Sequence, residues 1–218
     1  MTLRELQMLV AQGEGLHIEF KRKLPEWEKL VREIVAFANT EGGSVLIGVD
    51  DDGSILGTRD PIEVEEALKL YLQEYTHPVP AHSIETIPLS HKRAVVAIHV
   101  PKSTHKPIRA LVRPGHSPEN LGHALIRIAD SSAKASKEMV ELLKYEGREY
   151  DVKVELREKE TMLLQYLDAH PHITVGQFAA LAKINRTVAS RTLVHLVKGN
   201  MLRIVPQLQG DDWFCLLE

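Results

Sequence analysis

Five basic side chains near the C-terminus stand in a stretch of the chain that has no acidic residue. Between Asp168 and Asp211 there is no Asp or Glu. The basic residues of this stretch are Lys183, Arg186, Arg191, Lys198 and Arg203. Lys and Arg neutralise phosphate oxygens, and Arg can also clamp a guanine edge. In a chain whose formal net charge is -3, such a local block indicates contact with phosphate, although a solvated helix face is the alternative interpretation.

The elements that must position this block follow from the spacing of apolar residues. Three helices are predicted, and Asn185 is the expected N-cap of the third. Two β-like runs on either side of Gln209-Gly210-Asp211-Asp212 predict a hairpin. The predicted helices and strands lie at residues 159–169, 174–181, 185–198, 202–205 and 213–217. Their order resembles that of a winged helix-turn-helix domain, which we place at residues 158–218.

In a winged helix-turn-helix domain the third helix enters the major groove of DNA by its N-terminal residues. The residues expected to face DNA are Arg186, Thr187, Ser190 and Arg191. Lys198 and Arg203 are expected to reach the phosphate backbone. A helical module used for dimer packing or for binding a protein partner is the alternative, because a fold does not fix a function.

The N-terminal two thirds of the chain predict an α+β domain at residues 1–148, followed by a linker at residues 149–157. The expected helices lie at residues 3–11, 25–38, 60–72 and 132–145. The expected strands lie at residues 17–21, 45–49, 84–89, 94–100, 108–112 and 124–128. Residues 45–57 are expected to form a hairpin. Its turn is Asp50-Asp51-Asp52-Gly53, because Asp and Gly tolerate turn geometry.

Composition excludes several classes of protein. The chain is 44% hydrophobic and 26% charged, which is ordinary for a globular protein and unlike a disordered one. Apolar runs such as residues 94–98 fall far short of the roughly 20 residues that a membrane span needs. The N-terminus lacks the layout of a secretion signal, and the single Cys215 cannot form an internal disulfide. These features predict a cytoplasmic protein.

Four stretches carry a resemblance to a known family. They are Glu-Phe-Lys at residues 19–21, Ala-Asn-Thr-Glu-Gly-Gly at 38–43, Gly-Val-Asp-Asp at 48–51 and Leu-Ile-Arg-Ile at 125–128. Together they resemble the Schlafen Alba-type domain, also described as a divergent AAA or DNA-binding domain. The resemblance covers roughly residues 3–145. It implies a mixed α/β fold which, in bacteria, often precedes a helix-turn-helix module in transcriptional regulators.

The resemblance also implies a nuclease as an alternative function. Animal Schlafen proteins cut structured RNA with two Glu and one Asp, and the matching positions here are Glu14, Glu19 and Asp50. Carboxylate oxygens suit Mg²⁺ or Mn²⁺, which activates water and neutralises charge on phosphate. Lys21 and Lys23 are expected to hold phosphate nearby. The competing interpretation is that these acids form turns and caps without catalysis.

Other ligands have weaker support in the sequence. ATP is not expected, because the chain has no Gly-Lys-Ser or Gly-Lys-Thr phosphate loop. The eleven His residues lack the spacing of a zinc site. Arg109, Arg113 and Arg127 are candidates for further phosphate contacts, although such residues are more often surface or paired arginines.

The leading prediction is therefore a cytoplasmic DNA-binding transcriptional regulator, acting as a homodimer across two half-sites. The alternative is a Mg²⁺- or Mn²⁺-dependent endoribonuclease that uses Glu14, Glu19 and Asp50. A protein-interaction scaffold is the third hypothesis, and RNA remains an alternative partner to DNA.

Overall fold

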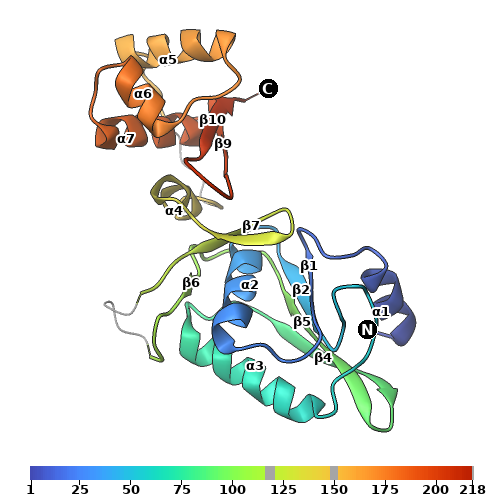
Figure 1. Cartoon of the computed structure of the whole chain (residues 1–218). Coiled ribbons are helices and arrows are strands. Elements are labelled where there is room, and N and C mark those ends of the chain that lie inside the picture. The colour runs from blue at the N-terminus through green and yellow to red at the C-terminus, as the bar shows by residue number, and fades with distance from the viewer. Residues whose placement is uncertain (116–120, 148–151, 218) are drawn as a thin grey trace. The chain divides into compact units, whose positions relative to one another are not determined.

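The chain divides into two units, each with its own hydrophobic core. A computed structural model describes residues 1–115, 121–147 and 152–217. Its contacts separate a first unit, Met1–Lys134, from a second unit, Ala135–Glu218. Figure 1 shows the helices and strands of each unit. None of the described helices has the length and apolar character needed to cross a membrane.

A four-stranded mixed sheet forms the centre of the first unit. Its strands are β1 (Ile18–Lys21), β2 (Gly43–Ile47), β4 (Ser83–Ser90) and β5 (Arg93–Val100). They stand in the order β1-β2-β5-β4, with β1 and β2 parallel and the other pairs antiparallel. All four strands were predicted from the sequence. Continuous apolar runs in β2 and β5 agree with strands that are covered on both faces.

Helices cover the two faces of this sheet. The three helices are α1 (Leu3–Val10), α2 (Trp27–Asn39) and α3 (Pro61–Tyr75). Leu30, Val31 and Ile34 of α2 pack with α3 against one face, whereas α1 packs on the other. Successive side chains of a strand point to opposite faces, so β2 contributes to both cores.

The same alternation decides where the predicted site residues of β1 point. Ile18 and Phe20 are buried in the core under α1. Glu19 lies between them in the strand and therefore points to the opposite face, where its side chain is also buried, with the whole residue 8% exposed. The burial of a carboxylate requires a partner for its charge.

Short strands complete the first unit. They are β3 (Thr76–His77), β6 (Arg109–Ala110), β7 (Leu125–Ile128) and β8 (Ser131–Lys134). The predicted strand at residues 108–112 shrinks to the two residues of β6. The turn of the predicted hairpin at residues 45–57 is present. Beyond β2, however, the only strand-like pairing described in the hairpin is the isolated bridge between Val49 and Ile55.

The predicted helix at residues 132–145 is wrong in its first part. Residues 131–134 form β8, which pairs with β7 in an antiparallel register. The helix α4 (Lys137–Leu143) begins only after Ser136, whose side chain caps it by accepting from the Met139 N–H at 3.0 Å. Pairing with β7 supplies the backbone hydrogen bonds of residues 131–134, and this tertiary contact overrides their helical pattern.

The described residues of the second unit form four helices and a hairpin. After α4 come α5 (Glu158–Ala169), α6 (Val175–Leu181) and α7 (Arg186–Lys198), then β9 (Leu202–Val205) and β10 (Trp213–Leu216). These last five elements lie where the sequence predicted them. Their shared core includes Phe178, Leu193 and Phe214, which are fully buried.

The helix α4 belongs to the second unit, because it packs on α7. The predicted first domain, residues 1–148, included this helix instead. The predicted limit at residue 148 and part of the linker at residues 149–157 lie outside the described residues. The predicted linker boundaries therefore stay a prediction.

Candidate nucleic-acid interface

The helix α7 is anchored along one face and exposed along the other. Asn185 caps its N-terminus, since the side-chain oxygen accepts from the Val188 N–H at 2.9 Å. Ala189, Leu193 and Leu196 recur at helical spacing and are fully buried in the core of the second unit. The cap and the buried stripe fix the rotation of the helix, and with it the residues that face outward.

Three of the four residues predicted to read DNA are exposed on α7. They are Arg186, Thr187 and Arg191. The guanidinium of Arg186 lies 3.3 Å from a carboxylate oxygen of Asp211 in the hairpin turn. Both side chains are more than half exposed, so this ion pair contributes little to stability and Arg186 can exchange its partner.

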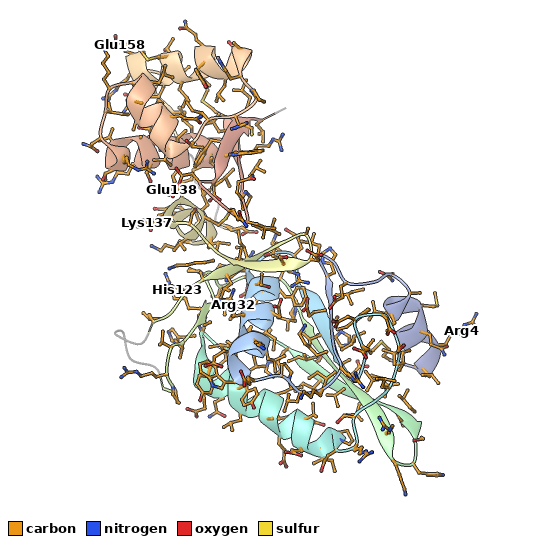
Figure 2. All side chains as sticks on the ribbon, viewed as in Figure 1. Arg4, Arg32, His123, Lys137, Glu138 and Glu158 are labelled. Carbon is orange, nitrogen blue, oxygen red and sulfur yellow. The ribbon has the colours of Figure 1, made fainter. Side chains whose placement is uncertain are left out.

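Ser190, the fourth predicted residue, is half-buried. Its hydroxyl donates a hydrogen bond to the carboxylate of Glu138 on α4. Glu138 is labelled on α4 in Figure 2. The helix α4 therefore covers part of the face of α7 that the sequence assigned to DNA, and it places a negative charge there.

The two residues predicted to reach the backbone differ in their surroundings. The ammonium of Lys198 lies 3.1 Å from the centre of the Tyr145 ring, a cation–π contact. Arg203 is exposed on β9. Arg203 is thus accessible to a ligand, whereas Lys198 already has an aromatic partner.

In the first unit, the strand residue Glu19 is the partner of two cations. One of its carboxylate oxygens accepts from a guanidinium N–H of Arg127 at 2.6 Å. The other pairs with the ammonium of Lys21. A buried ion pair is retained when its charges are paired and hydrogen-bonded, as they are here.

Arg127 is the centre of this buried network and does not face solvent. Its side chain is 0% exposed, lies 4.9 Å from the Phe37 ring centre and donates to the carbonyl oxygen of Gly15 at 3.0 and 3.1 Å. It also pairs with Glu33. The interpretation of Arg127 as a paired arginine is confirmed, and its use as a phosphate contact is wrong because its side chain has no access to a ligand.

The carboxylate of Glu33 lies at the edge of the same network. Burial raises its pKa above the ordinary value, although a hydrogen bond from Ser132 and the charge of Arg127 act in the opposite direction. Glu19 nearby adds to the rise by charge repulsion. Burial, together with repulsion from the Glu19 carboxylate, therefore outweighs the charge of Arg127 and raises the pKa of Glu33.

The remaining predicted residues of the first unit lie in separate settings. Glu14 is exposed, and its carboxylate accepts from the Phe20 N–H at 2.8 Å, which ties the loop before β1 to the strand. Asp50 follows β2 and lies 3.5 Å from the guanidinium of Arg22. Lys23 is exposed, whereas Lys21 is held by Glu19.

A comparison with protein families decides what the first unit is. The family described as Schlafen, AlbA_2 matches residues 14–136, which is more than half of the chain. The chain belongs to the Schlafen AlbA_2 family. The match includes the buried pair of Glu19 and Arg127, and it ends at the start of α4.

Two solved structures are similar to this chain. One is the N-terminal domain of a RecG-related protein from Nitrosomonas europaea, with 22% identity, a TM-score of 0.44, and coverage of 62% of this chain and 94% of that one. The other is the DIP2311 protein from Corynebacterium diphtheriae, with 16% identity, a TM-score of 0.43 and coverage of 92% of this chain. The match spans only 36% of the DIP2311 chain.

The AlbA_2 domain does not present its predicted acids as a metal centre. Both oxygens of Glu19 already have cationic partners, Glu14 holds a backbone N–H, and Asp50 lies beside Arg22. Among the described residues no three His, Cys, Asp or Glu side chains form a group that could hold a metal ion. This arrangement does not fit Mg²⁺ or Mn²⁺, and the catalytic role of the three acids stays a prediction.

Sequence reasoning missed a group of basic residues before and at the start of α5. Lys153, Arg157 and Lys159 line a pocket together with residues of α7. The signal was present as a highly charged stretch at residues 146–157, of which residues 149–157 were interpreted as a linker. Its four acidic and three basic residues are interspersed and sum to a formal charge of -1, which does not indicate a basic binding surface.

Proposed function

We propose that this chain is a DNA-binding transcriptional regulator whose second unit is a winged helix-turn-helix domain. In this proposal α6 and α7 are the helix-turn-helix, and the β9–β10 hairpin is the wing. The observation that carries it is the exposure of Arg186, Thr187 and Arg191 in the first two turns of α7, a helix whose apolar stripe is buried in the core of its unit. Membership in the Schlafen AlbA_2 family supports an association with nucleic acid.

The acids around α7 set a condition for this function. Arg186 has Asp211 as its partner, and Ser190 has Glu138. Phosphate groups would be repelled by both carboxylates, so DNA must replace them as the partner of these side chains. The exposed Arg186–Asp211 pair is exchanged at little cost, whereas Ser190 is released only when α4 or its Glu138 side chain moves.

A gel-shift assay with labelled duplex DNA and structured RNA tests the proposal, with Mn²⁺ and separately with EDTA. We expect intact substrates and a salt-sensitive shift of the duplex, because phosphate contacts release counterions. Arg186→Ala and Arg191→Ala should each weaken binding by about 1–3 kcal/mol. Lys144→Ala, an exposed cation of α4's C-terminal cap, is the matched control and should bind as the wild type does.

The endoribonuclease alternative makes the opposite prediction in the same assay. Cleavage of RNA that requires Mn²⁺ and is lost in Glu19→Gln or Asp50→Asn would contradict a purely regulatory function. Asp50 pairs with Arg22 and lies outside the network around Arg127, so loss of cleavage in Asp50→Asn would not report unfolding of that network. The predicted homodimer is tested separately, by the mass of the protein in sedimentation equilibrium.

A further inference from the structure

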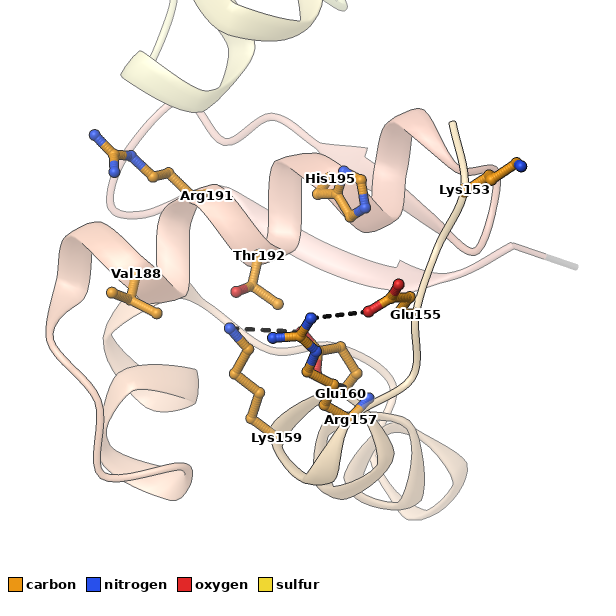
Figure 3. A pocket seen from close by; sticks show the side chains of 9 residues that line it. All are labelled: Lys153, Glu155, Arg157, Lys159, Glu160, Val188, Arg191, Thr192 and His195. Carbon is orange, nitrogen blue, oxygen red and sulfur yellow. Dashed lines mark hydrogen bonds and ion pairs between the residues drawn. The ribbon is translucent and has the colours of Figure 1, made fainter. Parts of the chain in front are cut away.

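A pocket with basic walls lies in the second unit, between α7 and the segment that leads into α5. Its volume is about 510 Å³. The basic residues that line it are Lys153, Arg157, Lys159, Arg191 and His195. We call this site the basic pocket. Figure 3 shows Arg157 and Lys159 near Thr192, whereas the side chains of Arg191 and Lys153 point outward at opposite ends of the view.

The geometry of α7 explains why these residues share one site. Four residues of α7 line the pocket, and their spacing of three, one and three residues places them on one side of the helix. They are Val188, Arg191, Thr192 and His195. This side differs from the one that carries Arg186 and Ser190, which line another pocket with Glu138 and Asp211. The basic pocket is therefore separate from the surface that is blocked by acids.

The charges of the basic pocket do not cancel. Its four Lys and Arg side chains face two carboxylates, those of Glu155 and Glu160. Arg157 lies 2.8 Å from Glu155, and Lys159 lies 3.5 Å from Glu160. Within the described part of the chain, Lys153 and Arg191 have no ion-pair partner. Two positive charges thus have no carboxylate partner, one at each end of the pocket (Figure 3).

The two ion pairs of the pocket are not equivalent. Arg157 and Glu155 are 76% and 75% exposed, so their pair is worth little and Arg157 can turn to an incoming anion. The side chain of Glu160 is only 10% exposed, and its carboxylate also accepts from the Arg157 N–H at 3.2 Å, where it caps α5. Glu160 is therefore fixed and positions Lys159 at the edge of the site.

We propose that the basic pocket binds a phosphate-bearing ligand. Arg offers a planar fork that matches phosphate oxygens, and Lys adds a point charge that tolerates several geometries. The volume exceeds that of one phosphate group and accommodates a diphosphate. Two sources carry this chemistry: a free phosphorylated small molecule, and the backbone of bound DNA, for which the inference rests on the proposed function.

The test compares the wild type with Lys153→Gln/Lys159→Gln in two assays on the full chain. Titration calorimetry with pyrophosphate measures the free ligand. Fluorescence anisotropy with a mixed-sequence duplex at several salt concentrations measures DNA. Lys144→Gln removes an exposed charge of the same unit outside the pocket and is the matched control. Far-UV circular dichroism checks that each variant is folded.

If the ligand is a free phosphorylated molecule, the wild type should bind pyrophosphate. The double variant should then bind it at least roughly tenfold more weakly. If the ligand is the DNA backbone, the wild type should not bind pyrophosphate. The double variant then binds DNA more weakly, and its salt slope falls by about 2, since about 0.9 is lost per phosphate contact. Lys144→Gln should match the wild type in both cases.

The proposal is overturned if the double variant behaves as Lys144→Gln does in both assays, or if the wild type binds neither probe. Arg186→Ala separates this result from a failure of the proposed function. Arg186 does not line the basic pocket, so its loss should leave pyrophosphate binding unchanged. A wild type that binds pyrophosphate but no DNA would support the pocket and contradict the DNA-binding regulator.

Discussion

Arg127 joins segments of the first unit that are far apart in the sequence. Its guanidinium contacts the loop at Gly15, the strand residue Glu19 and the helix residue Glu33. A buried cation with two carboxylate partners stabilises the fold only as a complete set, because a charge left alone in the interior is costly.

Replacing Arg127 by Met should destabilise the first unit strongly. The variant keeps the volume of the side chain but leaves Glu19 buried without its guanidinium partner. We expect the free energy of unfolding, measured by urea denaturation, to fall by about 3–5 kcal/mol. Arg4→Met, at an exposed position of α1, is the matched control and should change it by no more than about 0.5 kcal/mol. A loss below about 1 kcal/mol for Arg127→Met would contradict the network.

Glu33 should make the stability of the protein fall as pH rises from mildly acidic values. Its pKa in the folded protein is raised above the ordinary 4.5, so the folded state holds this proton more tightly than the unfolded state does. Between 4.5 and the raised value, unfolding releases a proton, and the free energy of unfolding therefore decreases with increasing pH.

Glu33→Gln isolates this effect, because Gln does not titrate and still accepts hydrogen bonds from Arg127 and Ser132. Urea denaturation at a series of pH values should show a decrease above pH 4.5 in the wild type relative to the variant. Carboxyl groups with lowered pKa values, such as those of Glu5 and Glu85, occur in both proteins and cancel in the difference. Parallel curves would show that Glu33 has no raised pKa.

At the scale of elements, the N-terminus of α7 has to be ordered before it can present Arg186 and Thr187. Asn185 provides that order through its bond to the Val188 N–H. Asn185→Ala should lower the free energy of unfolding by about 0.5–2 kcal/mol and also weaken binding of duplex DNA, since the first turn frays. Asn185→Asp keeps the capping oxygen and should retain the stability. Equal losses in the two variants would show that the cap is unimportant.

The helix α4 covers part of α7 through the bond between Glu138 and Ser190. Removing this negative charge should make the face of α7 more accessible to DNA. We expect Glu138→Gln to bind duplex DNA several-fold more tightly at low salt, where charge repulsion is least screened. Glu141→Gln on the same helix, whose partner is Lys144, is the control. Unchanged affinity of Glu138→Gln would show that α4 does not limit access to α7.

At the scale of the whole molecule, each unit contains one Trp, and the fluorescence of that Trp reports on the unfolding of its own unit. Trp27 stacks on Tyr75 in the first unit, with 3.7 Å between ring centres, and Trp213 stacks on His172 in the second, at 4.1 Å. The cores share no residues. The two units should therefore differ in how they respond to a cavity made in either core.

Phe178→Ala opens a cavity in the core of the second unit and should destabilise that unit by about 3–5 kcal/mol. In single-Trp proteins, made with Trp27→Phe or Trp213→Phe, the urea transition of Trp213 should move while that of Trp27 stays. Phe37→Ala in the first unit is the mirror experiment and should move only the transition of Trp27. Transitions that move together would show that the units unfold as one.

Elements set by local sequence were predicted well. Apolar periodicity and caps placed α3, α5, α6 and α7 within a few residues, because helix ends depend on side chains such as Asp60 and Asn185 that bond to nearby backbone. The strands of the central sheet were also predicted, because their alternating or continuous apolar residues are visible within a few neighbouring positions. The prediction failed for β8, whose strand state depends on pairing with β7.

The sequence by itself determined the family, the order of elements and the basic character of α7, since these depend on residue types and short spacings. Only the tertiary structure decided what the charged residues do. It paired Glu19 with Arg127, which is 108 residues away, placed Glu138 within a hydrogen bond of Ser190, and brought Lys153, Arg157 and Arg191 to the lining of one pocket. A charge acts through its neighbours in space, and burial and distance, which decide its strength, are not written in the order of the residues.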